Sequence, residues 1–357
     1  MGISYGLNLK LDIFGGSHDE KIGMRLSGIP AGEEIDMDAL RAFMARRAPG
    51  QDAYSTKRRE SDEPVFLSGL DGCRTNGDVI EAVIYNTNQH SGDYSSLIDT
   101  PRPSHADFAA RMKYGDKVDL RGGGHFSGRL TAPMCIAGGI CLQILGRRGI
   151  KICAHIYSIG GIADLPFDPV SVSEKDFSLI HSRRFAVIDE DAGEEMKKRI
   201  EDARLDGDSV GGIVECAAIG LPVGLGEHMF ASVEGAISGI VFGIPAVKGI
   251  EFGAGFSSAS ILGSQNNDPF FTDGERRFTK SNTSCGILGG MTSGMTIIFR
   301  AEIKPTPSIA KEQDSVSISR MENVKISVGG RHDPCIVPRA VPVFEAACAL
   351  AITDLML

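Results

Sequence analysis

A short glycine-rich loop near the start of the chain holds the first residues whose types could do chemistry: Gly15, Gly16, Ser17, His18 and Asp19. An imidazole titrates near neutral pH, so His18 could protonate a leaving group. The glycines beside it let backbone amides come close to an anion. The alternative is a turn with a histidine on the surface, and this motif alone favours neither interpretation.

Two further segments combine histidine with cations and glycine. Residues 102–107 read Arg-Pro-Ser-His-Ala-Asp, and residues 121–129 read Arg-Gly-Gly-Gly-His-Phe-Ser-Gly-Arg. Three consecutive glycines are costly to order, which favours a backbone cradle for an anion over a plain flexible turn. They precede an apolar run from residue 131, a candidate helix whose N-terminus could face a phosphate. The pattern is not Gly-x-Gly-x-x-Gly after a strand, so a dinucleotide-binding fold is disfavoured.

Five cations lie close together in an otherwise acidic chain, and they are Arg46, Arg47, Lys57, Arg58 and Arg59. Guanidinium groups bind phosphate and carboxylate with paired hydrogen bonds, so the cluster favours a small polyanionic ligand. A solvated run of charges is the alternative for some of the five.

Three segments of the C-terminal third are also candidates. Residues 282–294 carry four glycines among small polar side chains, and residues 304–308 read Lys-Pro-Thr-Pro-Ser, a stiff turn that could clamp a phosphate. Arg331, His332 and Asp333 place a cation, an imidazole and a carboxylate side by side. Beside glycine-rich loops this indicates an acid–base pair with an anion anchor, although in an exposed turn it is merely hydrophilic. None of these groups has the spacing of a zinc site, and we predict no metal.

The elements that must position these segments alternate irregularly between helix and strand. Apolar periodicity predicts helices over residues 36–47, 131–145, 189–205 and 340–357, the last apolar enough for a core or a subunit interface. Strand patterns cover residues 65–67, 79–85, 210–219 and 296–303. The polar stretch 308–324 is expected to be a mobile loop. No linker divides the chain, so the sequence predicts one α+β domain over residues 1–357 rather than a doubly wound sheet.

The composition limits the class of protein. The chain has 357 residues, a formal net charge of -9 and 44 glycines, against a usual share of about 7%. Net acidity argues against a nucleic-acid binder, whose binding face is normally basic. The most apolar stretches are interrupted before the ~18 residues of a membrane span, and no basic region precedes an apolar one as in a signal peptide. Eight cysteines without a CxxC pair indicate reduced thiols, so we expect a soluble cytoplasmic protein that binds no membrane.

Taken in order, these segments resemble chorismate synthase from about residue 13 to near the C-terminus, most weakly over residues 156–206. The most specific matches are Arg-Arg-x-Pro-Gly at residues 46–50, Lys-Arg-Arg-Glu at 57–60, Asn-Thr-x-Gln at 86–89, Lys-Tyr-Gly at 113–115, Arg-Gly-Gly-Gly at 121–124, Ala-Val-Lys-Gly at 246–249, Gly-Ser-Gln-Asn at 263–266, Gly-Ile-Leu-Gly-Gly at 286–290, the segment 330–335, and Arg-Ala-Val-Pro at 339–342.

The resemblance implies a reaction and three catalytic residues. The family forms chorismate, at the end of the shikimate pathway to the aromatic amino acids, by 1,4-elimination of phosphate from 5-enolpyruvylshikimate 3-phosphate. It uses reduced FMN without net redox change, since the flavin lends an electron that weakens the carbon–oxygen bond. By position in the family, His18 would protonate the departing phosphate and His105 would stabilise the anionic reduced flavin. Asp333 would act as the base through flavin N5.

The resemblance also implies binding residues and an architecture. Arg47, Arg129 and Arg331 would anchor the substrate. The flavin would be held by Arg47, His125, Phe126, Ser127, Pro245, Ala246, Gly289, Lys304, Pro305, Thr306, Pro307, Ser308 and Arg331. The family fold is a β-α-β sandwich with helices between antiparallel sheets, usually a homotetramer, which agrees with the α+β prediction and the apolar final helix.

The chain departs from the family pattern at several cations. Arginines of the family are replaced by Ala48, Ala53 and His125, and the loop at residues 15–19 reads Gly-Gly-Ser-His-Asp where the family has Gly-Glu-Ser-His-Gly. Phe126 is a further departure beside the expected flavin. Each lost cation could cost about 1–3 kcal/mol as a charged hydrogen bond. Cations elsewhere could compensate.

Three functions therefore stay open, with the active enzyme leading because all three catalytic residues are present. The second is a divergent non-catalytic paralogue that binds a flavin or a phosphorylated ligand. The third is an oxidoreductase that uses the same loops. The chain has no spare domain for a flavin reductase, so an external reductase is expected, with NADPH as an indirect electron source.

Overall fold

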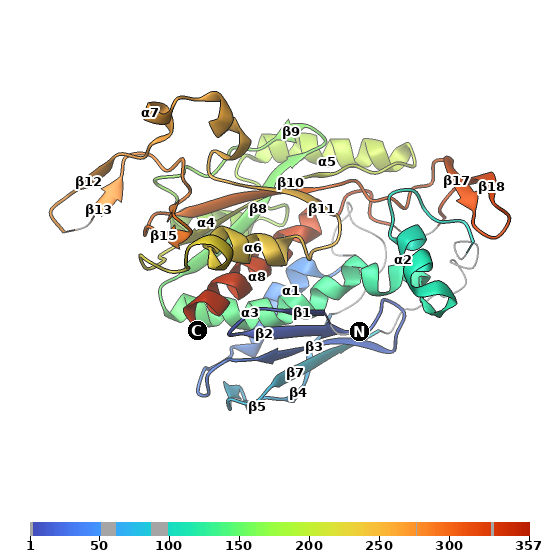
Figure 1. The fold of residues 1–357 in the computed structure, drawn as a ribbon, viewed down its shortest axis with the longest axis horizontal. Coiled ribbons are helices and arrows are strands. Elements are labelled where there is room, and N and C mark those ends of the chain that lie inside the picture. Colours follow the sequence, from blue (N-terminus) through green and yellow to red (C-terminus); the bar gives the residue numbers. More distant parts are fainter. Residues whose placement is uncertain (1–2, 51–61, 87–98, 276, 330–331) are drawn as a thin grey trace.

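Two antiparallel sheets enclose a layer of helices. The computed structural model describes residues 3–50, 62–86, 99–275, 277–329 and 332–357. Helices α3 (Thr131–Arg147) and α8 (Val337–Met356) lie between two five-stranded sheets (Figure 1). This β-α-β sandwich confirms the predicted α+β class.

The two sheets come from different parts of the chain. The first has the order β1-β2-β3-β7-β4, with strands Ile3–Tyr5, Lys10–Phe14, Lys21–Ser27, Ile80–Tyr85 and Val65–Ser68. The second has the order β11-β16-β10-β8-β9, with strands Val247–Phe252, Ile297–Ile303, Gly212–Ile219, Lys151–Ile159 and Ile162–Ala163. All neighbouring strands run antiparallel. The four predicted strands are confirmed within a few residues.

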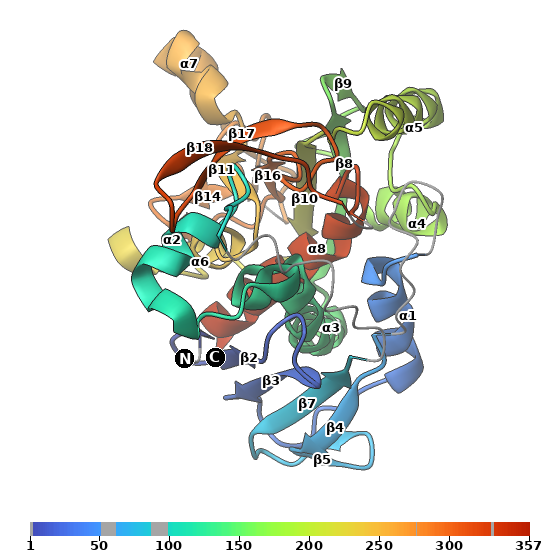
Figure 2. The same cartoon turned by 90° about the vertical axis from the view of Figure 1, so that its right-hand side faces the viewer.

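The predicted helices are confirmed as well. Helix α1 (Met37–Arg47) begins at Asp36, whose side chain accepts hydrogen bonds from the amides of Asp38 and Ala39. The other helices are α2 (Asp107–Tyr114), α4 (Glu174–Ser182), α5 (Glu190–Leu205), α6 (Val233–Val241) and the short α7 (Gly263–Asn266). Figure 2 shows α1 and α3 beside the first sheet, with α4 and α5 toward the second.

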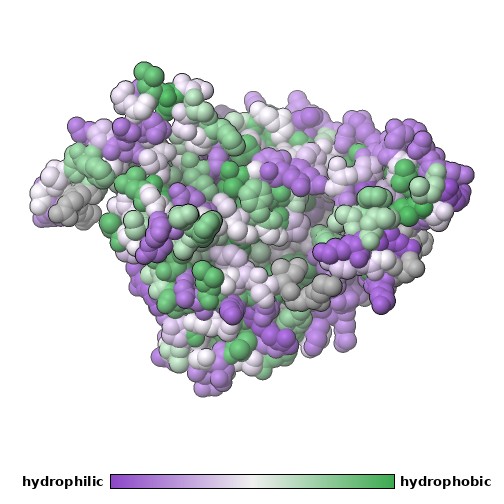
Figure 3. All heavy atoms as spheres, viewed as in Figure 1, coloured by the Kyte–Doolittle hydropathy of each residue, from purple (hydrophilic) through white to green (hydrophobic). Residues whose placement is uncertain are grey.

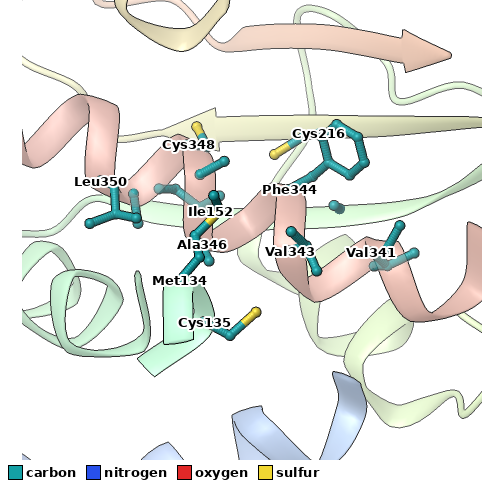
Figure 4. Packing of buried hydrophobic residues seen from close by; sticks show 14 of the residues in the cluster. Met134, Cys135, Ile152, Cys216, Val341, Val343, Phe344, Ala346, Cys348 and Leu350 are labelled. Atoms are coloured by element: carbon teal, nitrogen blue, oxygen red, sulfur yellow. The ribbon is translucent and has the colours of Figure 1, made fainter. Parts of the chain in front are cut away.

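Close packing of α3 against α8 forms the centre of the core. A β-carbon at Gly138 would lie 2.3 Å from the Cβ of Ala346, so the two backbones approach where a side chain would not fit. Phe344 and Cys348 are completely buried, and Figure 4 shows them among apolar side chains of α3, α8, β8 and β10. Removing this much apolar surface from water is the main stabilising contribution to such a core.

One helical stretch, Gly128–Arg147, is long and apolar enough by length and composition to cross a membrane, among the residues that the structure describes. This corrects the expectation that every apolar stretch is interrupted too early. Of its most apolar window, 78% is buried inside the protein. A buried core helix passes the same test, so the finding is weak evidence for a membrane span.

The polar stretch 308–324 is not the mobile loop that its composition predicts. It contributes to a hairpin of β17 (Gln313–Ser317) and β18 (Glu322–Ile326). Asp99 accepts hydrogen bonds from Ser317 Oγ at 2.6 Å and from the amide of Ser319 at 2.8 Å. These partners lie far away in the sequence, so local polarity could not reveal them. The other hairpins are β5 (Leu70–Asp71) with β6 (Arg74–Thr75), β12 (Phe270–Thr272) with β13 (Arg277–Thr279), and β14 (Ile287–Leu288) with β15 (Met291–Thr292).

The cysteines are free thiols, as the sequence predicts. Cys73 is exposed and the other seven are buried. Burial raises the pKa of Cys141 to about 12, so this thiol stays protonated near neutral pH.

Candidate active site

His18 lies in the loop between β2 and β3 and packs on a glycine. The residue is 7% exposed. A β-carbon at Gly122 would lie 2.3 Å from His18 Cε1, and Gly122 has a φ of +58°. Both the backbone conformation and the space therefore require glycine at this position.

Two contacts hold the His18 loop to the glycine loop. The amide of Ser17 donates a hydrogen bond to the carbonyl of Gly124 at 3.2 Å. On the other side, His125 Nδ1 lies 3.0 Å from the carbonyl of Gly15. The backbone of the His18 loop is thus held by one main-chain group and one side chain of the glycine loop.

His105 packs on the next glycine of the same loop. A β-carbon at Gly123, where φ is +90°, would lie 3.6 Å from His105 Nε2 and 3.7 Å from its Cε1. Gly122 therefore faces His18 and Gly123 faces His105. The structure brings the two candidate catalytic histidines to adjacent positions of one loop.

A buried ion pair lies on the opposite side of the His105 ring. His105 Nδ1 is 2.5 Å from Asp107 Oδ1. Arg102 donates to the same carboxylate from Nε, at 2.7 Å, and from Nη2, at 2.8 Å. Burial by itself raises the pKa of the Asp107 carboxyl, but the hydrogen bonds from Arg102 and His105 hold that pKa well below its usual range.

The segment 304–308 contacts this ion pair and the His105 loop. Arg102 Nη1 donates to Ser308 Oγ at 2.9 Å, and the Lys304 ammonium donates to the carbonyl of Ser104. The amide of Lys304 donates to the carbonyl of Ala246 at 3.0 Å. The structure therefore brings one group of expected flavin-binding residues next to His105, namely Pro245, Ala246, Lys304, Pro305, Thr306, Pro307 and Ser308.

These residues fit an anionic, phosphorylated cofactor such as reduced FMN. Thr306 Oγ1 is buried and has no hydrogen-bond partner among the described residues, so it can still bind a ligand oxygen. Burial and the nearby charge of Lys248 both lower the pKa of Lys304. Two ammonium groups close enough to repel each other gain stability when an anion lies between them.

The rest of the expected flavin site is divided. Ser127 lies near His105, because its Cβ is 3.5 Å from the β-carbon position of Gly123. His125 and Phe126 are exposed side chains. Gly289 lies apart, in the β14–β15 turn, where the next residue accepts a hydrogen bond from the amide at the start of α6. The segment with Ala246 instead follows the C-terminal end of α6. The two ends of this nine-residue helix are about 14 Å apart.

The two described arginines of the expected substrate site share one carboxylate, which the sequence analysis missed. Asp62 is 1% exposed and accepts from Arg47 Nη1 at 2.6 Å and from Arg129 Nη1. Burial raises the pKa of this carboxyl, but the charges of Arg47 and Arg129 outweigh burial, so the pKa lies below its usual value. Arg47 also donates to the carbonyl of Gly128, and Arg129 donates to Asn86 Oδ1. The position of Asp62, three residues after the last of the cations Lys57, Arg58 and Arg59, was the available signal.

Arg46 lies outside this group, which corrects the interpretation of the basic cluster. It donates to both oxygens of Glu345, at 2.6 and 2.9 Å. Cys153, His181 and Glu345 could hold a metal ion by the spacing of their ligand atoms, within 4.8 Å of one another. Arg46 already binds the carboxylate, however, and burial opposed by the Arg46 charge leaves the pKa of Glu345 at about 2. Lys57, Arg58 and Arg59 lie outside the described residues.

His332 and Asp333, the described part of the predicted C-terminal acid–base group, lie near the arginine and histidine residues of the candidate site. Asp333 Oδ2 accepts from Arg339 Nη1 at 2.5 Å, and Arg339 Nε donates to the carbonyl of Arg47 at 3.2 Å. Burial lowers the pKa of His332, and the charges of Arg102 and His105 lower it further. Arg339 therefore links Asp333 to the backbone of Arg47. The neighbouring residue, His332, lies close enough to Arg102 and His105 for their charges to lower its pKa. Arg331 lies outside the described residues.

The lost cations have different surroundings. Ala48 is 2% exposed and ends α1, so this position is part of the core. The histidine at position 125 uses its Nδ1 to contact the His18 loop, as described above. Ala53 lies outside the described residues.

Two cavities lie away from the candidate site. One of about 370 Å³ is lined by residues between Leu165 and Ile188. The other, of about 690 Å³, lies beside Asp36, Cys73 and Arg147. Neither is lined by a candidate catalytic or binding residue.

Comparison with known proteins gives one consistent result. A family model described as chorismate synthase matches residues 9–357. The chorismate synthase of Lancefieldella parvula is 41% identical over 365 residues, covering 99% of this chain and 96% of the relative. That of Thermococcus kodakarensis is 43% identical over 352 residues, covering 99% and 97%. A crystal structure of chorismate synthase superposes with a TM-score of 0.78 at 28% identity, covering 99% of this chain and 92% of the other.

Proposed function

The chain belongs to the chorismate synthase family, and from this premise we propose that it eliminates phosphate from 5-enolpyruvylshikimate 3-phosphate with reduced FMN to give chorismate. It is thus an enzyme of chorismate and aromatic amino-acid biosynthesis. The observation that carries the proposal is the placement of His18 and His105 on adjacent glycines of one loop. A proton donor for the leaving group and a partner for an anionic cofactor are thereby held side by side.

The residues of the chain supply proton transfer and charge stabilisation. His18 donates a proton to the departing phosphate oxygen, and His105 holds an anionic cofactor by hydrogen bonding. Asp333 accepts the proton that leaves the ring. Reduced FMN, when bound, supplies the transient electron donation that weakens the carbon–oxygen bond.

The cations bind the acidic groups of substrate and cofactor. Asp62 holds Arg47 and Arg129 in fixed orientations. Arg331 is a third substrate anchor that the family resemblance implies. Lys304 and Thr306 bind a cofactor phosphate. Preorganised donors of this kind act mainly by stabilising charge that develops in the transition state.

The setting of the enzyme is also part of the proposal. We expect flavin to be reduced by an external reductase, with NADPH as the indirect electron source, in the cytoplasm. We expect a homotetramer, which large exposed apolar side chains support: Phe230, Phe256, Leu262 and Phe270 are each at least 70% exposed. Figure 3 shows hydrophobic residues gathered toward the side where α6, α7 and β12 lie. Such surface commonly marks an interface.

The test is an anaerobic turnover assay with chemically reduced FMN and 5-enolpyruvylshikimate 3-phosphate. Chorismate and phosphate should form catalytically and in equal amounts, and the same mixture with oxidised FMN should give neither. Tight FMN binding without product would refute the proposal and indicate the non-catalytic paralogue. Steady nicotinamide oxidation without phosphate release would indicate an oxidoreductase.

A further inference from the structure

The contact between His105 and Asp107 fixes the proton on one ring nitrogen. Asp107 is ionised, because its pKa is held well below the usual range, and an ionised carboxylate only accepts hydrogen bonds. His105 Nδ1 lies 2.5 Å from Oδ1 of this carboxylate. Nδ1 must therefore carry a hydrogen. In a neutral imidazole this leaves Nε2 unprotonated, on the edge of the ring that faces Gly123. Nε2 is then the nitrogen that takes up a proton, and the imidazolium that forms, paired with Asp107, can donate from Nε2 to an anionic ligand.

Arg102 holds the carboxylate in place. Its Nε and Nη2 each bind one oxygen of Asp107, and its own backbone amide donates to Oδ2 at 3.1 Å. Arg102 is 4% exposed and Asp107 is 1% exposed. Arg102 Nη2 also lies 3.1 Å from His105 Nδ1. An unprotonated Nδ1 could accept from it, but Nδ1 lies closer to the Asp107 carboxylate, at 2.5 Å, where only a protonated nitrogen is favourable, so both nitrogens donate to Asp107 Oδ1.

The remaining guanidinium nitrogen contacts the segment at residues 304–308, which is expected to bind flavin. Arg102 Nη1 donates to Ser308 Oγ at 2.9 Å, and Ser308 is itself 7% exposed. One buried side chain thus connects the carboxylate that orients His105 with the segment at residues 304–308. A displacement of either would be transmitted to the other, because the guanidinium is planar and rigid.

We propose that Asp107 and Arg102 are positioning residues for the reaction. Asp107 keeps His105 in the tautomer with hydrogen on Nδ1, and Arg102 holds the side chains of Asp107 and Ser308 at fixed positions relative to each other. The proposal rests on the proposed function for the role of His105, but its structural part concerns the free protein. Neither residue acts on the substrate or the flavin directly. They determine which nitrogen His105 presents.

Replacing Asp107 with Asn should disturb this arrangement while preserving its shape. An asparagine can turn its amide so that its NH₂ group donates to Nδ1, which stabilises the opposite tautomer. We expect Asp107→Asn to lower kcat by about 10²- to 10⁴-fold with little change in the KM for substrate, because Nε2 can then no longer take up a proton and no carboxylate stabilises the imidazolium. Arg102→Lys, which retains charge but cannot bind both oxygens in a fork, should lower kcat less.

The direct test is the tautomer of His105 in ¹⁵N-histidine-labelled protein without flavin, measured by long-range ¹H–¹⁵N correlation above neutral pH. The chain has eight histidines, so the His105 signal is assigned by its loss in His105→Gln. The wild type should show hydrogen on Nδ1, and Asp107→Asn should shift the population toward Nε2. Turnover is measured on the same samples.

Glu345→Gln is the matched control. Glu345 is also buried, bound by an arginine at both oxygens and contacted by a histidine, His181, at 3.2 Å, yet it lies outside the site. Its loss should lower stability without moving the His105 signal. Hydrogen on Nε2 in the wild type, or unchanged kcat in Asp107→Asn, would overturn the proposal. If the wild type forms no chorismate, the proposed function fails instead, and the tautomer measurement still decides the positioning claim.

Discussion

Two histidines of this molecule have the same kinds of neighbours, but we propose a catalytic role for only one of them. His105 contacts one carboxylate, Asp107, through Nδ1, and its side chain is 15% exposed. His155 on β8 contacts two carboxylates, Asp164 through Nδ1 at 3.0 Å and Glu215 through Nε2 at 2.9 Å, and is completely buried. Each carboxylate network also includes an arginine, Arg102 in the first and Arg300, at 2.8 Å from Glu215, in the second.

The difference lies in the second ring nitrogen. In His155 both nitrogens are satisfied inside the protein, so the ring joins strands and has nothing left for a ligand. In His105 the other nitrogen faces a glycine, which leaves room beside it. A buried histidine with a carboxylate and an arginine therefore does not by itself indicate catalysis; a ligand also needs a ring nitrogen that the protein leaves accessible.

The largest expected effect is on the catalytic side of the comparison. His105→Ala and His18→Ala should each lower kcat by about 10²- to 10⁴-fold, the usual contribution of a positioned proton donor or acceptor. The proteins should remain folded, as judged by circular dichroism and the denaturation midpoint. Full activity in either variant would end the assignment of that residue.

For His155 we expect the opposite result, a loss of stability without a loss of turnover. His155→Leu leaves Asp164 and Glu215 buried without the positive charge between them, which should lower the free energy of unfolding by about 3–5 kcal/mol. Turnover per folded molecule should persist. His228→Leu is the control, because His228 contacts a carboxylate on the surface, with 78% of its side chain exposed, and should change stability by less than about 0.5 kcal/mol. Urea denaturation measures both, and equal effects would refute the structural role of His155.

A smaller effect separates backbone strain from histidine placement. Gly122→Ala and Gly115→Ala both put a side chain at a positive φ, +58° and +62°. Each should lower stability by at least about 1–2 kcal/mol, and Gly115→Ala by more, because its ψ of −146° lies in a region that essentially only glycine occupies. Only at Gly122 would the new Cβ meet His18, since the position at Gly115 has nothing within 4 Å. Turnover should therefore fall in Gly122→Ala and stay normal in Gly115→Ala. Equal turnover in the two would show that His18 does not depend on the glycine.

The smallest effect is a dependence of stability on pH. Burial lowers the pKa of His155, but its hydrogen bonds to Asp164 and Glu215 outweigh this and raise the pKa above 6.5. Its contribution to stability is therefore complete below about pH 6.5 and is lost as the pH rises through the raised folded value. The stability difference between wild type and His155→Leu should shrink across that alkaline range. A difference that grows with pH would show that His155 is neutral in the folded protein.

The sequence predicted those parts of the molecule that depend on local pattern. The buried helices, the main strands and the histidine loops follow from apolar periodicity and glycine clusters, and the resemblance placed the candidate catalytic residues. The pairing of Arg47 and Arg129 on Asp62 could not be predicted, because it joins three segments that meet only in the folded chain. The same reason explains why Arg46 looked like a site residue.

The most direct test of the account is a crystal structure of the protein with oxidised FMN and 5-enolpyruvylshikimate 3-phosphate, which do not turn over together. We predict the substrate phosphate at His18, and the flavin beside His105 with its own phosphate near Lys304 and Thr306. Ligands bound away from both histidines, for example in the cavity between Leu165 and Ile188, would contradict it.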